Sequence, residues 1–417
     1  MQHRTDVIRP VTPGAGGFRR LVCAALASLG LYALLFGAVL DRPLDLGFLA
    51  RQFDDGLARA ATIRGPKLVI LAGSNGPYSH RCQVIEPMLD LPCVNGGVAI
   101  GIGLDYLFMR WRAQLHPGDI VYLPMEQQQY TVGRSATALG PDAAIMFRHD
   151  WPTLGELAPQ RWLAALFAFD LRAGLMSMIE MSLVAVGFHD PRAETSGTRN
   201  AWGDHVGHTV ARAGTSPAVL AAMLAPPASA AAIRDGYGAG LIAGFVVWAR
   251  AHGVRVIGGL PTQLDPAARA GILGPETLVP EALRSAMPAV ERLSATSQRA
   301  TSRPEVSRSE TSRPDTAQPS ARLAAIEAVY LRHGGEFLLL ANHSHYPSAA
   351  FFDTPLHLNE PCQIAHSITL ARALAPMLGR AALAPPITLS AAAAECPGIA
   401  GAMSLAQGVS LSAGGSR

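Results

Sequence analysis

The stretch LVILAGSNGPYSH, residues 68–80, decides the fold we expect, because it joins a wholly apolar run to a turn of small residues. A continuous apolar run of this kind is typical of a parallel strand that is covered on both faces. Ser74 stands where the strand ends, between Gly73 and Asn75. Two interpretations are open at this point: an ordinary strand-to-loop turn, or a nucleophilic serine presented at the mouth of a parallel sheet.

Apolar runs alternate with stretches of helical spacing along much of the remaining chain. This β-α alternation predicts an α/β fold with a mainly parallel sheet and helices on both of its faces. Beyond the first strand, we expect strands within 92–103, 116–130, 254–263 and 336–343, and helices at 104–115, 238–253 and 321–335.

The segment 21–40 contains no charged residue, and about 20 apolar residues span a bilayer core. Four arginines precede it against a single acidic residue, which predicts that residues 1–20 are cytoplasmic and that the rest lies outside. A cleaved signal peptide is the alternative, but the apolar run is longer than such peptides need and lacks a good cleavage site. We therefore expect a single-pass anchor in the inner (cell) membrane, with an extracytoplasmic or periplasmic domain.

The composition of the 417-residue chain excludes some classes of protein. Hydrophobic residues make up 49%, enough for a sizeable core, and the net charge of +3 argues against a nucleic-acid-binding protein. No cysteine and histidine spacing is typical of a zinc site, so we expect neither metal nor cofactor. Cys82 and Cys93 are close in sequence and can pair in an oxidising compartment.

Two segments interrupt the α/β alternation. Residues 131–237 include an apolar part, 161–188, that charges break up, so we expect helices of a cap over the sheet rather than a second span. Residues 296–321 are rich in Ser, Pro and Arg, which predicts a disordered insertion. The expected division of the chain is a cytoplasmic N-terminus (1–20), an anchor (21–40), a linker (41–65), an α/β domain (66–380) and a low-complexity tail (381–417).

Asp353 and His357 lie near the C-terminus, just before a predicted helix. A hydrolase triad needs a nucleophile, a base that takes its proton and a carboxylate that orients the base. Sites in open α/β sheets form beyond the carboxyl ends of the strands, so Ser74 can meet this pair there. Two alternatives stay open: the pair only caps the following helix, or His343 or His345 serves as the base.

These motifs, in this order, resemble the SGNH (GDSL-type) hydrolase superfamily, in particular its membrane-anchored branch linked to O-acylation of polysaccharides. The resemblance implies a flavodoxin-like three-layer sandwich over residues 66–380. It also implies that Ser74 is the nucleophile, His357 the base and Asp353 its orienting carboxylate. In the glycine-rich segment VNGGVAIG, the N–H of Gly97 or Gly101 would join that of Ser74 in an oxyanion hole.

The sequence departs from the family pattern in three places. Gly73-Ser74-Asn75 replaces Gly-Asp-Ser, and Asp353 and His357 are one residue further apart than usual. Glu126 stands near the position of an asparagine that would donate to the oxyanion, and a carboxylate cannot donate unless protonated. Either Gln127 donates instead, or Glu126 has another task, such as binding a sugar hydroxyl.

The function expected from these residues is a serine esterase or O-acetyltransferase that acts on acyl esters of an envelope or extracellular polysaccharide. Its partners would be an acylated glycan or an acyl-donor protein, within a polysaccharide-synthesis complex. The alternative is a non-catalytic glycan-binding or scaffold subunit of a polysaccharide export or modification complex. A lipid-directed esterase that uses 161–188 is a third interpretation.

The segment NAWGDHVGH, residues 200–208, gathers one acid and two histidines. Asp204, His205 and His208 indicate either a metal or substrate site, or a polar turn within the cap.

Overall fold

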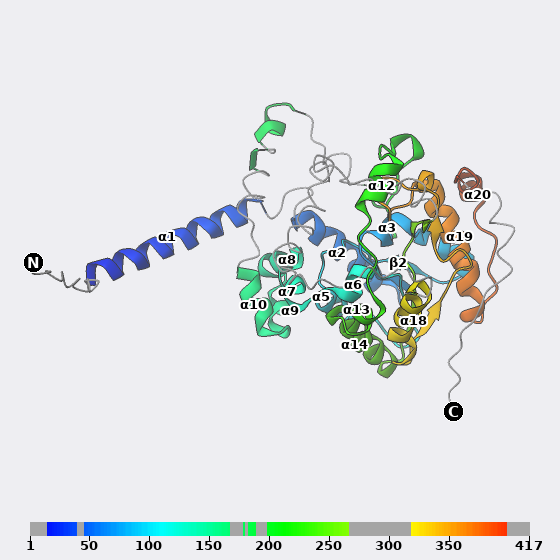
Figure 1. Ribbon diagram of the computed structural model, residues 1–417, viewed down its shortest axis with the longest axis horizontal. Helices are drawn as coiled ribbons and strands as arrows, with labels where there is room; N and C mark the ends of the chain where they lie inside the picture. Colours follow the sequence, from blue (N-terminus) through cyan, green and yellow to red (C-terminus); the bar gives the residue numbers. More distant parts are fainter. Residues whose placement is uncertain are drawn as a thin grey trace, which may run out of the picture.

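The computed structural model describes residues 15–39, 46–166, 178–179, 182–188, 198–266 and 318–397. A long helix, α1 (Ala15–Val39), extends from an α/β body that contains one five-stranded sheet (Figure 1). Its strands run in the order β2-β1-β3-β4-β6, and every neighbouring pair is parallel. The strands are β1 (Leu68–Ile70), β2 (Cys93–Asn95), β3 (Ile120–Leu123), β4 (Arg255–Gly259) and β6 (Glu336–Leu338).

The expected α/β class with a mainly parallel sheet is confirmed, and each expected strand is present. The strands are covered on both sides, because successive side chains point to opposite faces. In β1 and the residue after it, Val69 and Leu71 belong to one core cluster, while Leu68 and Ile70 belong to the other. This explains why the run that ends at Ser74 is apolar throughout instead of alternating.

Helices form the layers on the two faces of the sheet. On one face lie α2 (Leu46–Thr62), α5 (Leu104–Arg112), α14 (Tyr237–Ala251) and α18 (Gln318–Leu331). On the other lie α4 (Cys82–Leu89), α19 (Glu360–Met377) and α20 (Ile387–Ala394).

The remaining elements are short. They are α3 (Asn75–Ser79), α6 (Gln127–Thr131), α7 (Arg134–Ala138), α8 (Pro141–His149), α9 (Trp151–Glu156), α10 (Pro159–Leu166), η1 (Val210–Arg212), α12 (Pro217–Met223), α13 (Ala230–Arg234), η2 (Ser348–Ala350) and the two-stranded parallel sheet of β5 (Gln263–Leu264) and β7 (His345–Tyr346).

The helix α1 is the one helix in the described part of the chain that is long and apolar enough to cross a membrane. Its most apolar window, Gly17–Leu34, has a mean hydropathy of 1.3 and no part of it is buried. The helix overlaps the expected anchor at 21–40. The apolar segment 161–188 lies partly outside the described residues, and its described part contains no second candidate span.

Residues 41–65 are not the linker that the sequence predicted, because α2 occupies most of them. Phe53, Leu57 and Ala60 are buried on one face of α2, at the spacing that helical periodicity requires. The prediction of a linker overlooked this apolar stripe.

The prediction of a low-complexity tail from residue 381 is also wrong in part, because residues 387–394 form α20. A disulfide between Cys362 and Cys396 ties the end of this helix to α19. A second disulfide joins Cys82 to Cys93, the pairing that their proximity in sequence allowed.

The last residues of the expected disordered insertion, 318–321, are helical, because α18 begins at Gln318. Residues 296–317 lie outside the described part of the chain.

A buried ion pair joins the amino-terminal ends of β1 and β3. Lys67 Nζ lies 2.6 Å from Asp119 Oδ2, and both side chains are at most 1% exposed. Asp119 also accepts the backbone N–H groups of Lys67 and His116. The carboxylate therefore fixes the edge of the sheet opposite to the one where Ser74 emerges.

We expect Asp119→Ala to lower the free energy of unfolding by about 3–5 kcal/mol, because it leaves the Lys67 ammonium buried and uncompensated. The exposed pair of Arg255 and Glu336 provides the matched control, since their side chains are 42% and 40% exposed. Glu336→Ala should cost less than about 1 kcal/mol. Chemical denaturation of both variants measures the difference, and equal losses would contradict the assignment of Asp119 as a fixed point of the sheet.

Candidate active site

Ser74 lies beyond the carboxyl end of β1, directly before α3. Its hydroxyl makes no hydrogen bond with the backbone of α3 and lies 2.8 Å from His357 Nε2 instead. The position before it favours glycine, because a Cβ on Gly73 would lie 2.9 Å from Glu126 Oε1 and 3.1 Å from the Cα of Ile100. The small-residue turn thus brings the serine hydroxyl to the edge of the sheet, where it contacts His357 from the C-terminal region of the chain.

His357 and Asp353 lie in the loop between η2 and α19. His357 Nδ1 is 2.7 Å from Asp353 Oδ1, so the imidazole bridges the carboxylate and the Ser74 hydroxyl. The wider spacing of the pair is accommodated in a tight loop, in which the N–H of Phe352 donates to the carbonyl of His357. The structure therefore brings together the three side chains that the sequence assigned to a triad.

Two hydroxyl groups hold the loop that carries His357 by hydrogen bonds to its backbone. Ser79 Oγ and Thr262 Oγ1 each lie 2.9 Å from the carbonyl oxygen of Leu356, and 2.6 Å from each other. Asn359 then caps α19 by accepting the N–H of Cys362. These bonds fix the backbone on both sides of the imidazole.

Tyr78 holds the imidazole plane of His357. The two rings are nearly parallel, with centroids 4.1 Å apart and an angle of 7° between their planes. His205 stacks on Tyr78 with a centroid distance of 4.0 Å, so the phenol ring lies between the two imidazoles. This stack restricts rotation of the His357 ring about the axis that would turn Nε2 away from Ser74.

The segment 200–208 divides between two tasks. Asp204 accepts the N–H groups of Cys82 and Gln83, so it satisfies orphan donors at the start of α4. His205 and His208 lie instead beside Tyr78, next to the triad. No group of three or more residues suited to hold a metal occurs in the part of the chain that the structure describes.

Burial keeps both of these histidines neutral. It lowers the pKa of His205 to about 2 and that of His208 to about 4. Both ring nitrogens of His208 lack a hydrogen-bond partner among the described residues, although the side chain is almost fully buried.

Of the two glycines expected at the oxyanion, Gly97 already donates its N–H to Asn95 Oδ1 at 3.3 Å. Gly97 packs so closely on the turn that a Cβ there would lie 2.8 Å from the carbonyl of Gly73. Gly101 follows Ile100, whose Cα and Cβ would lie 3.1 and 3.2 Å from a Cβ on Gly73, so this glycine is also next to the nucleophile turn.

Glu126 and Gln127 follow β3, at the same edge of the sheet. Glu126 is buried and caps α6 in a reciprocal pair with Gln129, while its Oε1 approaches the nucleophile turn at Gly73. Gln127 Oε1 accepts the N–H of Ala228, which ties the 131–237 segment to this edge. The side chain of Gln127 thus contacts the inserted segment, and that of Glu126 lies next to Gly73, the residue before the serine.

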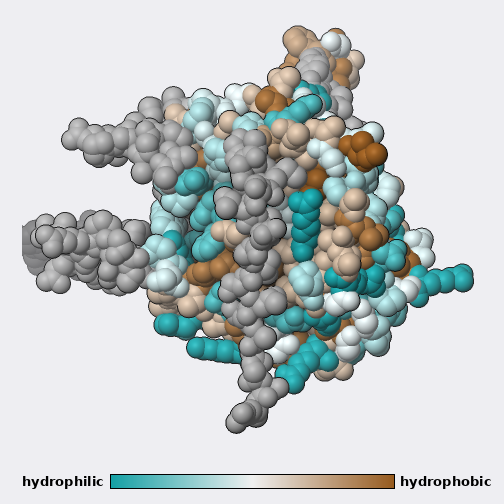
Figure 2. Space-filling view, turned by 90° about the vertical axis from the view of Figure 1, so that its right-hand side faces the viewer, coloured by the Kyte–Doolittle hydropathy of each residue, from teal (hydrophilic) through white to brown (hydrophobic). Residues whose placement is uncertain are grey.

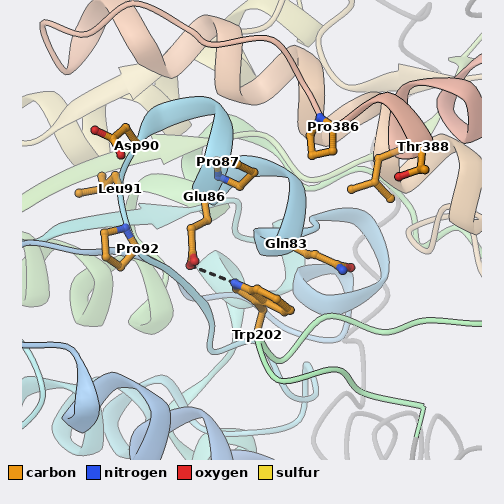
Figure 3. A pocket seen from close by; sticks show the side chains of 10 residues that line it. Gln83, Glu86, Pro87, Asp90, Leu91, Pro92, Trp202, Pro386 and Thr388 are labelled. Carbon is orange, nitrogen blue, oxygen red and sulfur yellow. Dashed lines mark hydrogen bonds between the residues drawn. The ribbon is translucent and has the colours of Figure 1, made fainter.

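Of the alternative bases, His343 lies in the loop after β6 and His345 begins β7; it is His357 that contacts Ser74. A separate pocket of about 590 Å³ lies between α4 and the chain at α20, and no triad residue lines it (Figure 3). Trp202 at its rim donates to Glu86 Oε2.

The sequence analysis missed Tyr78, although it stands in the quoted stretch four residues after Ser74, one helical turn away. His205 and His208 were noted, but nothing in their spacing linked them to the triad. Comparison with family models, with curated proteins and with solved structures finds no match to this chain. The site is therefore interpreted from its own geometry.

Acid should destabilise the fold through its buried neutral histidines. Burial also lowers the pKa of His80, to about 4, so this histidine is held neutral as His205 and His208 are. Free histidine titrates near pH 6.5, so the unfolded chain binds more protons below that pH than the folded chain does. Stability is therefore fully present above about pH 7 and is lost as the pH falls from 6.5 towards 4.

We expect His208→Phe to make this loss shallower, by about 1 kcal/mol between pH 7.5 and pH 5.5, because one buried titrating group is removed. Denaturation at both pH values measures it. Val210→Ala, which removes no titrating group from an exposed position, is the control and should leave the pH dependence unchanged. An identical pH dependence in His208→Phe and in the unmodified protein would show that His208 is not held neutral.

Proposed function

We propose that this chain is a membrane-anchored serine esterase or O-acyltransferase that acts on acyl esters of an envelope or extracellular polysaccharide. The observation that carries the proposal is the unbroken line from Ser74 Oγ through His357 to Asp353, with hydrogen bonds of 2.8 and 2.7 Å. Nucleophile, base and orienting carboxylate in this geometry are what acyl transfer through a serine requires.

The proposed reaction has two steps. Ser74 Oγ attacks the acyl carbonyl carbon while His357 Nε2 takes the hydroxyl proton and Asp353 stabilises the imidazolium. The bond to the leaving alcohol then breaks, and His357 returns the proton to that alcohol, which leaves an acyl-serine. In the second step His357 deprotonates water or a glycan hydroxyl, which takes the acyl group and restores Ser74.

Features of the fold support the resemblance to SGNH hydrolases. The strand order β2-β1-β3-β4-β6 corresponds to the flavodoxin-like order 2-1-3-4-5, and the site lies beyond the carboxyl ends of its strands. Helices α7–α10, α12 and α13 belong to the 131–237 segment, which reaches the site through Gln127 and the histidines His205 and His208. We assign this segment the role of a cap that limits the access of water.

The proposed location is the inner membrane, with residues 1–20 in the cytoplasm and the α/β domain outside. The apolar helix α1 and the arginines before it support this orientation. Two disulfides in the described domain support an oxidising compartment, since such bonds are rare in the cytosol.

A non-catalytic glycan-binding subunit is the second candidate. It is favoured by Glu126, which stands where the family supplies an oxyanion donor, and by the N–H of Gly97, which Asn95 already engages. Under this proposal the cleft would bind acylated glycan without cleaving it.

Covalent labelling by a fluorophosphonate separates the two candidates. In an active enzyme Ser74 Oγ bonds to phosphorus, fluoride leaves, and His357 takes the proton. We expect labelling of the unmodified protein and of Ser390→Ala, a variant in α20, but none of Ser74→Ala. Asp353→Asn should label more slowly, by up to about 10⁴-fold. A folded, unlabelled protein would reject the enzyme and favour the binding subunit.

Release of nitrophenol from p-nitrophenyl acetate distinguishes an esterase from a transferase. An esterase releases it at the same rate with or without a deacetylated glycan, because water accepts the acyl group. A transferase releases it faster when the glycan is present, and the glycan becomes acetylated. No release under either condition, together with unimpaired glycan binding by Ser74→Ala, would again favour the binding subunit.

A further inference from the structure

Exposed apolar side chains are concentrated in one stretch of the chain. Outside α1, the described residues include 13 large hydrophobic side chains that are exposed, and nine of them lie between residues 139 and 188. They are Leu139, Trp151, Trp162, Leu163, Met178, Ile179, Leu183, Val186 and Phe188. Single exposed apolar residues are ordinary, but a concentration in one segment indicates a surface that meets an apolar partner.

The helix α10 shows that this exposure is built into the packing. Arg161 is only 3% exposed, and its guanidinium is held between Asp142 and Asp105. Its neighbours Trp162 and Leu163 are 43% and 63% exposed. The helix therefore buries its charged residue and presents its two largest described apolar side chains, Trp162 and Leu163, outward, which is unusual for a helix that faces water.

The aromatic residues on this surface are of the kind that favours a membrane interface. Trp151 on α9 and Trp162 on α10 contact each other edge to face, with ring centroids 6.1 Å apart, and both are nearly half exposed. Tryptophan is enriched where a bilayer meets water, because its ring is apolar and its N–H is polar.

The anchor keeps this surface close to the bilayer. Only residues 40–45 separate the end of α1 from the start of α2, so these two points are at most about 25 Å apart. The helix α2 packs on α8, and α8 packs on α9 and α10. Figure 1 shows α7–α10 on the side of the body from which α1 extends.

The opposite side of the molecule differs. Figure 2 shows the face turned away from α1, where hydrophilic and hydrophobic residues are mixed in the part that grey atoms leave visible. The asymmetry matches a domain that rests on the membrane with one side only.

From these observations we infer that the exposed side chains of α9 and α10 form a membrane-contact surface that inserts into the interface of the bilayer. The inference rests on the membrane anchor of the proposed function and is independent of the triad. The partner is lipid, because the short connection between α1 and α2 holds the surface beside the bilayer in every molecule. With the domain seated in this way, the opening of the site has a fixed orientation relative to the membrane.

A spin label at Leu163 tests the inference in the full chain, reconstituted in vesicles of phosphatidylcholine and phosphatidylglycerol. Leu163→Cys is made in a Cys23→Ser background, because Cys23 is the free cysteine of the described residues. Val247→Cys on α14 is the matched control, since Val247 is 51% exposed and lines a hollow with Arg332 and His333 at the end of α18. Collision rates with oxygen, which partitions into lipid, and with a water-soluble nickel chelate are measured.

We expect the label at position 163 to collide more with oxygen than with the nickel chelate, and the label at position 247 to show the reverse. Equal nickel accessibility at both positions would overturn the inference. Protection of position 163 from both reagents that grows with protein density would also overturn it, by showing that a second copy covers the surface. Failure of the protein to float with vesicles would reject the anchor itself, whereas fluorophosphonate labelling reports separately on Ser74.

Discussion

The hydrogen bond between Ser74 Oγ and His357 Nε2 joins two segments that are 283 positions apart in the chain. The five-residue helix α3 makes this contact durable, because it does three tasks within one and a half turns. It begins directly after the serine, it presents Tyr78 to the face of the His357 ring, and it ends with Ser79, whose hydroxyl reaches the carbonyl before that histidine. The nucleophile, the ring that stacks on the base and the bond that fixes the loop are therefore parts of one rigid unit.

Much of the sheet and the triad could be predicted because their signals are local. A strand buried on both faces must be apolar throughout, and the runs at 68–71 and 120–123 are. The positions of Ser74 and His357 followed from a topological rule, since parallel strands place their carboxyl ends at one edge. The rule locates an edge and leaves the detail of side-chain contacts open.

The remaining features depend on packing between distant segments, which sequence spacing does not record. Nothing near His205 indicates that its ring stacks on Tyr78, and nothing near Arg161 shows that its charge is turned inward to two aspartates. The helix α20 is rich in alanine, and its composition is that of a loose tail. What makes it part of the fold is the bond from Cys396 to Cys362, 34 residues earlier.

That cystine has a practical consequence for where the chain can be cut. A recombinant version that stops at the apparent end of the domain, near Arg380, would lose α20 and leave Cys362 without its disulfide partner. Cys362 is in the first turn of α19, beside Asn359 and five residues after the imidazole that faces the serine. Expression boundaries for biochemical work should therefore extend past Cys396, and the host should offer an oxidising lumen in which the bridge can close.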